Sequence, residues 1–386
     1  MTVARLRFAL ISILAAFALA SVAQVKVVDA TNGNVVILAQ VINAKGQLMG
    51  FTTKDGFLPA DVKPAEGITI QHMAYEPYTL TAADIEGQTA RLTPRTYDVG
   101  EVVVKGAKQD YVYLRGYYRK YQTENWLDTL KQRYAEGMLE YVIKNSDWSF
   151  GKKPRVLTAD CFELDMFGDS ICKSSHKFND EKELSSNQRF LPKLDAELLI
   201  NSIKVEKLNF SLDADTLQGK HWPKAYFAKS GNTINVGTDQ LADKDSHTMR
   251  FPLLNTLLGI DLMFTDMNEN QLYQLREPGQ YKFSSLLGIS TCTAGQIGGR
   301  KVAKIFQKKY GVEISKKDYP VKAHEYSEVY FTEMEYITKE KAKELKKQKG
   351  YDTSIQNEIP ECVPALSSAT VRLKELIIER EKEVKQ

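Results

Sequence analysis

The residue patterns that carry common hydrolytic chemistry are missing from this sequence. A metallocarboxypeptidase site requires a glutamate three residues after a histidine, and none of the five histidines has one. The zincin motif His-Glu-x-x-His also fails, because His324-Glu325 is followed by Glu328 where a histidine is needed. No Gly-x-Ser-x-Gly pentad occurs, so the strained nucleophile turn of the α/β-hydrolases is not encoded. We therefore predict no catalytic residues and no metal ligands.

Two further segments could carry chemistry, a glycine-rich loop and a pair of aspartates. Gly295–Lys301 invites comparison with a phosphate-binding loop, because consecutive backbone amides bind oxyanions, but it lacks the Walker spacing and the Lys-Ser/Thr pair. We predict a turn between strands there. A pair of carboxylates such as Asp213 and Asp215 stays open as a hydrolytic site, since the sequence does not give the distance between the groups. We expect no enzyme and no cofactor, with a hydrolase of unfamiliar site as an alternative.

Aromatic and basic side chains alternate along residues 111–121. If this segment is a strand, one of its faces carries Tyr111, Tyr113, Arg115, Tyr117, Arg119 and Tyr121. Flat rings and bidentate guanidinium groups suit a sugar or a peptide, so the first five of these residues form a candidate ligand or partner face. The simpler interpretation, which we favour, is an ordinary half-exposed strand.

The four cysteines lie at positions 161, 172, 292 and 362. Cys161 and Cys172 flank Met166-Phe167-Gly168, a candidate turn, so they could face each other near the base of a hairpin as a disulfide. Three pairings are open. No Cys-x-x-Cys occurs, which disfavours zinc and thiol-redox roles.

The first 23 residues are typical of a secretory signal peptide. Arg5 and Arg7 precede an apolar stretch, Phe8–Ala20, and Ser21-Val22-Ala23 fits a signal peptidase site. Removing the two arginines changes 52 bases against 49 acids to 50 against 49. A net charge of +1 does not support nucleic-acid binding, and no later apolar run is long enough for a transmembrane helix. We expect an exported protein of the periplasm or outer membrane.

Residues 24–105 predict a small antiparallel sandwich. Strand-forming segments alternate with turn residues at Asn32-Gly33, Lys45-Gly46, Asp55-Gly56 and Glu66-Gly67. The expected strands are Val25–Val28, Val35–Val41, Leu48–Thr53, Ile68–Met73 and Val99–Val104.

The same residues carry a resemblance to a family. The matching segments are Val27–Val36, Ala39–Val41, Gly50–Phe57, Ile68–Tyr75 and the "EVVV" strand ending at Val104. Together they resemble the carboxypeptidase regulatory-like domain, a transthyretin-like seven-stranded sandwich found at the N-terminus of cell-envelope proteins of the Bacteroidetes type. Despite the name, this module has no catalytic residues of its own, so the resemblance implies packing or interaction.

Residues 106–386 predict a larger β-rich domain of uncertain fold. Strands are expected at Tyr111–Tyr121, Arg155–Met166, Val302–Lys309 and Tyr326–Ile337, and solvent-facing helices at Lys339–Lys349 and Leu366–Lys385. The stretch 127–144 permits a helix, but Gly137 and its dense Tyr, Val and Ile content favour a strand at Arg133–Lys144. Short segments such as Tyr117–Tyr121 and Glu328–Phe331 are similar to the region that follows the module in such envelope proteins, which implies a curved antiparallel sheet of the lipoprotein-carrier type.

The expected fold is therefore mainly β with helical additions: a signal peptide at 1–23, a transthyretin-like β-sandwich at 24–105, and an antiparallel β-rich α+β domain at 106–386 with a C-terminal helix. The expected function is a non-catalytic interaction or scaffolding role in the cell envelope, with an envelope protein or a glycan as partner. A carrier of an apolar ligand in a curved sheet is the other alternative. The lining of the largest concavity decides between them, since a dry apolar pocket favours a carrier and converging acids or histidines favour an enzyme.

Overall fold

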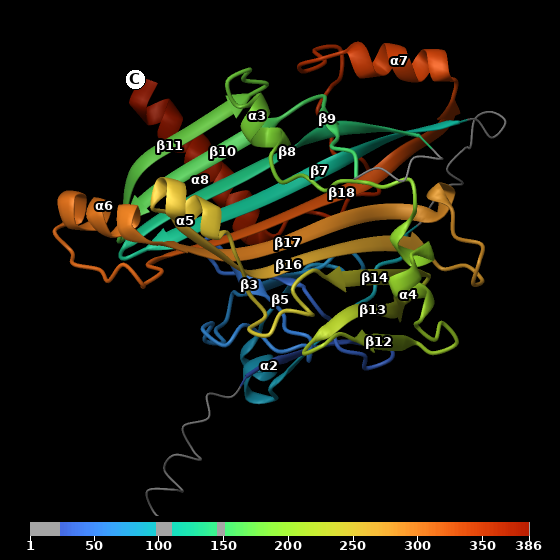
Figure 1. Ribbon diagram of the computed structural model, residues 1–386, viewed down its shortest axis with the longest axis horizontal. Helices are drawn as coiled ribbons and strands as arrows, with labels where there is room; N and C mark the ends of the chain where they lie inside the picture. Colours follow the sequence, from blue (N-terminus) through green and yellow to red (C-terminus); the bar gives the residue numbers. More distant parts are fainter. Residues whose placement is uncertain (1–23, 98–109, 145–150, 386) are drawn as a thin grey trace, which may run out of the picture.

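Strands dominate the computed structural model, which describes residues 24–97, 110–144 and 151–385 (Figure 1). Strands hold 42% of these described residues and helices 18%, so the fold is a β-rich α+β fold with large antiparallel sheets, as the sequence predicts. The expected signal peptide, the strand expected at Val99–Val104 and the boundary at residue 105 lie outside the described residues. No helix in the described ranges is long and apolar enough to cross a membrane.

The N-terminal unit, residues 24–97, is a small sandwich of two sheets. A four-stranded antiparallel sheet has the order β3-β2-β4-β5, and β1 pairs with β6 in parallel. Its elements are β1 (Lys26–Asp29), β2 (Gln40–Ile42), β3 (Leu48–Phe51), β4 (Thr69–Gln71), β5 (Tyr78–Thr79), α2 (Ala82–Glu86) and β6 (Thr89–Leu92). The turns expected at Gly33, Gly46, Gly56 and Gly67 all form, each with the positive φ that glycine adopts without strain.

The second part of the chain is one large antiparallel sheet. Its main path runs β11-β10-β8-β7-β18-β17-β16-β14-β13-β12, with β9 beside β8 and β15 beside β16. The strands are β7 (Tyr111–Trp126), β8 (Thr129–Lys144), β9 (Arg155–Val156), β10 (Asp160–Phe167), β11 (Ser170–Phe178), β12 (Ala214–Gln218), β13 (Pro223–Ser230), β14 (Thr233–Asp239), β15 (Met249–Arg250), β16 (Asp261–Gln274), β17 (Leu286–Gly298) and β18 (Val321–Ile337). The strand favoured at Arg133–Lys144 is confirmed as part of β8.

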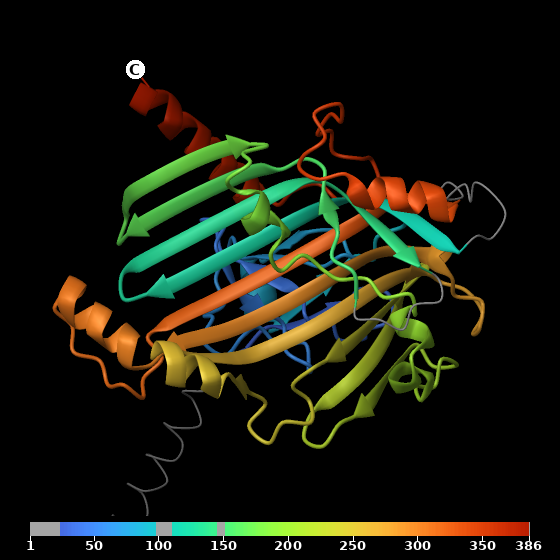
Figure 2. The same ribbon diagram turned by 45° about the horizontal axis from the view of Figure 1, so that its top comes forward.

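The sandwich packs against one face of this sheet, behind β16 to β18 in the view of Figure 2. Tyr117, Met138 and Tyr330 from the sheet share a buried core with sandwich residues such as Val27 and Ile70. Tyr117 and Tyr330 are fully enclosed by this contact.

The opposite face of the sheet has a core of its own. Successive side chains of a strand point to opposite faces, so Tyr118 on β7 and Leu139 on β8 lie on the side away from the sandwich. There they pack in one cluster with Leu194, Ile200 and Val205, which come from the connection between β11 and β12.

The helices of the second part lie mostly at the margins of the sheet. They are α3 (Leu184–Gln188), α4 (Ile203–Glu206), α5 (Pro252–Leu258), α6 (Arg300–Tyr310), α7 (Lys339–Lys347) and α8 (Ser368–Lys385), with 3-10 helices at Leu199–Asn201 and Phe283–Ser285. The two C-terminal helices confirm the sequence prediction. Unlike a helix facing only solvent, α8 buries Leu373 and Ile377 against one face of the sheet, where it crosses β10 and β11 (Figure 1).

Two secondary-structure predictions are wrong. The strand expected at Val302–Lys309 is part of α6, which buries Val302 and Phe306 on one side. A spacing of four places both residues on the same helix face, and Gly311 in the left-handed conformation ends the helix. The turn expected at Gly295–Lys301 is instead the end of β17, followed by the first residues of α6.

Candidate functional site

A cavity of about 650 Å³ lies between the sandwich and the large sheet. Its wall on the sandwich side is made mainly by residues between 49 and 61, at the end of β3 and in the turn and loop that follow, together with Gln24, Ile37 and Leu38. The opposite wall is made by residues from β12, β13, β14, β16, β17 and β18 and from the connections that flank β13 and β14. The site therefore exists only because the two units pack together.

Strand register sets the floor of this cleft. Asp266 on β16 pairs with Ala294 on β17, which pairs with His324 on β18. Neighbouring strands lie about 4.8 Å apart, so the backbones of Asp266 and His324 are roughly 10 Å apart on the same sheet face. Because Ala294 between them has a small side chain, the cavity is deepest at this point. The polar groups of Asp266 and His324 border it on either side.

The sandwich wall comes close to the sheet at Gly50. A Cβ on Gly50 would stand 3.9 Å from Nε2 of His324, which is ordinary van der Waals contact, and 3.0 Å from the Pro59 ring, so β3 lies directly over this histidine. At the rim, Lys322 of the sheet forms an ion pair with Asp61 of the sandwich, at 3.0 Å between Nζ and Oδ2. This pair joins the two walls directly.

A histidine, a carboxylate and a tryptophan form the most organised part of the cleft. Nε2 of His247 lies 2.5 Å from Oδ2 of Asp239, whose Oδ1 accepts a 2.7 Å hydrogen bond from the backbone amide of Leu241. The ring of Trp222 stacks on His247, with ring centroids 4.8 Å apart and an interplanar angle of 29°. The backbone of His247 is in the left-handed conformation, with a φ of 49°. This conformation is strained for any residue other than glycine, and residues strained in this way cluster at functional sites.

The titratable groups in the cleft have different protonation preferences. Burial raises the pKa of Asp266 to about 6, and the negative charge of Asp239 adds to this rise while His247 opposes it. The hydrogen bond to Asp239 raises the pKa of His247, which favours an imidazolium that donates to the carboxylate. Burial lowers the pKa of His324, so its ring is neutral near pH 7. The cleft thus contains a histidine–carboxylate pair that favours the charged imidazole, a second imidazole whose neutral form is favoured, and an acid that titrates near pH 6.

Carboxyl groups outnumber lysines in the lining of the cleft. Four aspartates line the cleft against two lysines. They are Asp55, Asp61, Asp239 and Asp266, against Lys54 and Lys322. This balance is unfavourable for a strongly anionic ligand. Within the described ranges, no group of three or more His, Cys, Asp or Glu side chains could hold a metal ion.

The candidate face on residues 111–119 lies elsewhere and is covered by the chain itself. Tyr117 and Arg119 are fully buried, and the Nη2 of Arg119 donates a 2.7 Å hydrogen bond to the carbonyl of Pro364. Tyr113 packs against α7, and Tyr111 lies beneath Lys346 of the same helix at 4.8 Å. Arg115 is half-buried and binds the Tyr113 hydroxyl. These five residues share a face as expected, but that face packs against the sandwich, α7 and the C-terminal segment.

The disulfide expected between Cys161 and Cys172 does not form, and all four cysteines are free. The β10–β11 hairpin turns later than expected, at Phe167 and Ser170, and its register pairs Cys161 with Lys177. Cys172 lies at the bulge near Met166, so roughly 15 Å of strand separates the two cysteines along the sheet. A disulfide requires Cα atoms within about 7 Å.

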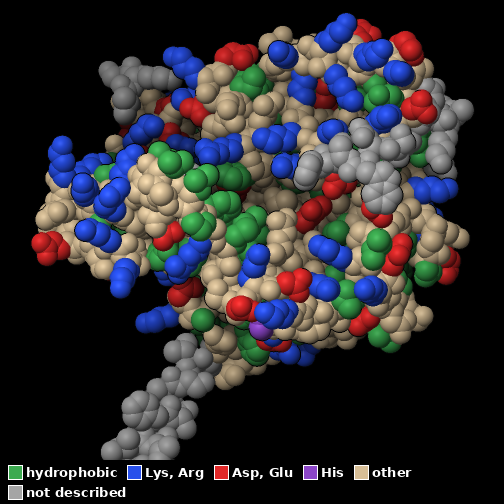
Figure 3. Space-filling model, viewed as in Figure 1, with side chains coloured by type: hydrophobic (Ala, Val, Ile, Leu, Met, Phe, Trp, Pro, Cys, Tyr) green, Lys and Arg blue, Asp and Glu red, His purple; other side chains and the backbone are tan. Residues whose placement is uncertain are grey.

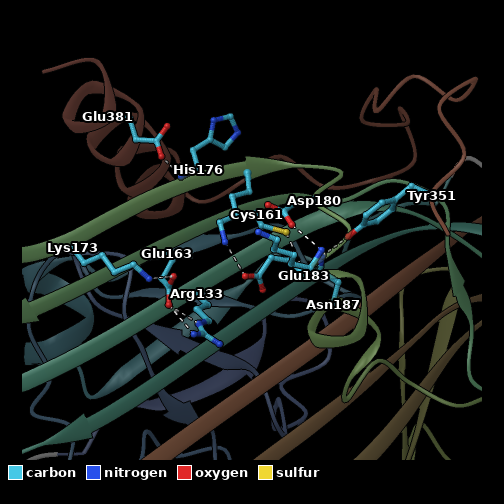
Figure 4. Close-up of polar contacts among 12 residues, drawn as sticks. Arg133, Cys161, Glu163, Lys173, His176, Asp180, Glu183, Asn187, Tyr351 and Glu381 are labelled. Carbon is cyan, nitrogen blue, oxygen red and sulfur yellow. Dashed lines mark hydrogen bonds and ion pairs between the residues drawn. The ribbon is translucent and has the colours of Figure 1, made fainter. Parts of the chain in front are cut away.

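Cys161 instead points toward α3 (Figure 4). Its Sγ donates to Oδ1 of Asn187 at 3.3 Å, and the Asn187 amide donates to the Tyr351 hydroxyl at 2.8 Å. Nearby, Arg133 and Lys173 both pair with Glu163 across three adjacent strands, β8, β10 and β11. These contacts tie the outer strands to α3 and to the 348–367 segment.

The residues of the cleft were not anticipated from the sequence. They are Trp222, Asp239, His247, Asp266 and His324, which come from segments spread over about a hundred positions. A search for local motifs cannot find them, because only the sheet register and the docking of the sandwich bring them together. The available signal was weak: two of the five histidines and one of the three tryptophans of the chain lie here.

Comparisons with known proteins add little to this geometry. No protein-family model matches the chain, and no curated protein matches it. Among solved structures, the chain is similar to one described as "lipid-protein interactions in lipovitellin", with a TM-score of 0.29 and 9% sequence identity. The match covers 68% of this chain and 28% of that chain, so this chain spans less than a third of its length. So distant a likeness supports no conclusion about fold or ligand.

Proposed function

We propose that this protein is an exported, non-catalytic cell-envelope protein that binds a short saccharide in the cleft between the sandwich and the large sheet. The observation that carries the proposal is the cavity of about 650 Å³ at a junction of two structural units, lined by a few converging polar groups. Cavities of this size at such junctions, with titratable groups of shifted pKa, are the usual sites of small-molecule binding.

The chemistry of the lining favours a ligand rich in hydroxyl groups. Asp266 offers carboxylate oxygens that accept from hydroxyls, and Asn268 both donates and accepts. Trp222 and Phe57 supply the aromatic surface on which the apolar face of a sugar ring packs. The excess of aspartates over lysines argues for a neutral ligand over a phosphorylated or sulfated one.

The envelope location rests on the sequence. The first 23 residues match a secretory signal, and residues 24–105 resemble the carboxypeptidase regulatory-like module of envelope proteins. Six described strands in two sheets, with glycine turns at the expected positions, are compatible with such a module. In this proposal the module forms one wall of the binding site, so its interaction role is to contact the saccharide.

Substitution of Trp222 tests the proposal. We expect at least one neutral di- to tetrasaccharide to bind the mature protein in calorimetry and to change its tryptophan fluorescence. Trp222→Ala should weaken that binding roughly tenfold or more, because it removes the stacking surface. Trp126→Ala is the matched control, since Trp126 lies at the end of β7, bonded to Tyr310, and does not line the cleft. Equal affinity in both variants, or no binding by any neutral saccharide, would contradict the proposal.

A second function, glycoside hydrolysis, is favoured by one observation. Asp266, with a pKa of about 6, is suited to donate a proton near neutral pH and lies in the same cleft as the Asp239 carboxylate. Asp239 is already engaged by His247 and by the Leu241 amide, so we rank binding first. Release of reducing ends from a bound saccharide, abolished in Asp266→Asn while binding persists, would establish hydrolysis. Binding without turnover is the result that our first proposal expects.

The apolar-carrier alternative lacks comparable support. The described cleft carries aspartates, lysines and histidines among its apolar residues, which is unlike the dry lining that an apolar ligand requires.

A further inference from the structure

The α5 helix presents apolar side chains to solvent. Leu253 and Leu257 are 69% and 70% exposed, and Leu258 is 53% exposed. A spacing of four places Leu253 and Leu257 one above the other on the same helix face. Isolated exposed leucines are ordinary on protein surfaces, but three on one seven-residue helix without a charged residue form a patch.

The neighbouring α6 helix is strongly basic. Five of its eleven residues are lysine or arginine, and none is acidic. Lys301, Lys304 and Lys308 recur at spacings of three and four on the side away from the buried Val302 and Phe306. Ile305, 46% exposed, lies among them. By contrast, the lysines of α7 alternate with Glu340 and Glu344, so α6 is the helix whose positive charge is not offset locally.

A backbone hydrogen bond joins the two helices. Gly259, in the left-handed conformation, ends α5 with a 2.9 Å hydrogen bond to the carbonyl of Asn255. The Gly259 carbonyl in turn accepts a 2.8 Å hydrogen bond from the amide of Lys301, in the first turn of α6. At the other end of α5, Phe251 packs edge-on against Phe264 of β16, with centroids 5.6 Å apart.

Figures 1 and 2 place α5 and α6 side by side at one end of the sheet, far from α4 at the other end. In Figure 3, hydrophobic side chains gather over α5 and blue basic side chains surround them over α6. We call this surface the α5–α6 tip. It consists of Leu253, Leu257, Leu258, Lys301, Lys304, Ile305 and Lys308.

We propose that the α5–α6 tip docks on an anionic lipid bilayer, with the leucines of α5 in the interfacial region and the lysines of α6 against lipid phosphates. The combination of an apolar patch with an adjacent basic face is complementary to such a surface, whose negative charge attracts lysines and whose acyl boundary accepts leucines. A purely apolar partner would leave the lysines unmatched, and a purely acidic partner would leave the leucines in water. This proposal is independent of the saccharide cleft.

Vesicle sedimentation tests the proposal with the full mature chain. We expect the protein to sediment with vesicles of phosphatidylcholine and phosphatidylglycerol, and to stay in solution with phosphatidylcholine alone. Added salt should reduce the bound fraction, because the lysine contribution is screened. Two variants should each lower the partition coefficient roughly tenfold or more: Leu253→Ser with Leu257→Ser, and Lys301→Gln with Lys304→Gln and Lys308→Gln.

Two matched controls separate a specific tip from general stickiness. Ile203→Ser removes an apolar side chain of α4 that is also 69% exposed. Lys339→Gln with Lys343→Gln and Lys347→Gln removes three exposed lysines from α7. Both should bind vesicles like the unchanged protein. Circular dichroism of every variant checks that the fold is retained.

Three results would overturn the proposal. One is equal binding to neutral and anionic vesicles, and another is unchanged binding in both tip variants. The third is a protein that is a dimer in light scattering and does not bind vesicles, and whose leucine variant is a monomer. In that case the tip would be a contact between two copies of the chain.

Discussion

Asp266 is held in an environment that resists its ionisation. The carboxyl lies in the cleft beside the ion pair of His247 and Asp239, and burial is the main reason that its pKa rises to about 6. In an unfolded chain the same group would titrate near its ordinary value of 3.8. Folding therefore favours the protonated form of Asp266, and the protein loses stability when this group must ionise.

The pH dependence of unfolding should reveal this group. A raised folded-state pKa means that the contribution of protonated Asp266 is fully present below pH 4 and is lost as the pH rises through about 6. The shift corresponds to up to about 3 kcal/mol. Asp266→Asn mimics the protonated acid, so urea denaturation should show the variant near wild-type stability at pH 4 and more stable than wild type at pH 8.

The control for this prediction is Asp245→Asn. Asp245 is a surface carboxylate that contacts Lys220 and His221, and these contacts lower its pKa. Its replacement should bring no gain in stability at pH 8. A difference between Asp266→Asn and wild type that does not change between pH 4 and pH 8 would refute the environment assigned to Asp266.

At the level of single residues, the sequence predicted backbone features better than the cleft. Asn32-Gly33 and Asp55-Gly56 identify turns because the requirement for positive φ is local to a few residues. His247 and His324 give no such local signal, because the residues around them in the cleft are brought there by the tertiary structure. The same applies to Cys161, whose expected partner is displaced by the register of the hairpin.

At the level of elements, β7 and β8 were predicted correctly and α6 was not. The alternation of Tyr111 to Tyr121 has the period of a strand, and a 16-residue strand contains it. In Val302–Lys309, the composition fits a strand as well as a helix, because Val, Ile and Phe occur in both. The four-residue spacing of Val302 and Phe306 and the glycine at position 311 were the decisive signals, and they favour a helix.

Gly137 shows why a strand can require a glycine in its interior. It lies in β8 where the chain at residues 157–159 crosses closely, and a Cβ at this position would stand 2.1 Å from the carbonyl oxygen of Thr158. The obstacle is backbone, so it cannot rotate away. We expect Gly137→Ala to destabilise the protein by about 3 kcal/mol or more, measured as a lowered midpoint of denaturation.

Gly279→Ala is the comparison variant for this prediction. Gly279 has a φ of 83° and nothing within 4 Å of the added Cβ, so only backbone strain opposes the substitution. This strain costs about 1 kcal/mol. If the Gly137→Ala protein were as stable as the Gly279→Ala protein, β8 and the chain at residues 157–159 would be able to move apart at little cost.

At the level of the whole molecule, the sandwich and the sheet behave as one core. Tyr117 and Tyr330 from the sheet are completely buried against the sandwich, and a second cluster joins Leu48 of β3 to Tyr121 and Tyr326. Domains joined by a small polar interface move independently, whereas these units share apolar side chains. We therefore expect them to unfold together.

Hydrogen exchange measures this coupling. Amides of β1 and β4 should open with the same free energy as amides of β7 and β18, and Tyr330→Ala should lower both values by about 3 to 4 kcal/mol. Tyr336→Ala, on the same strand but half-buried and outside the shared core, should affect the sandwich much less. Separate opening of the sandwich at a lower free energy would show two independent folding units.

The pairing of β7 with β18 also sets the order in which the chain can fold. Asn125 pairs with Lys322, which follows it by 197 positions (322 minus 125). A newly made chain can form the β7–β8 hairpin early, but the other edge of β7 stays unpaired until β18 arrives. Contacts this distant in sequence make folding slow, and an open strand edge invites pairing between chains. The central position of the last long strand thus gives this protein a long period of vulnerability to aggregation before its sheet closes.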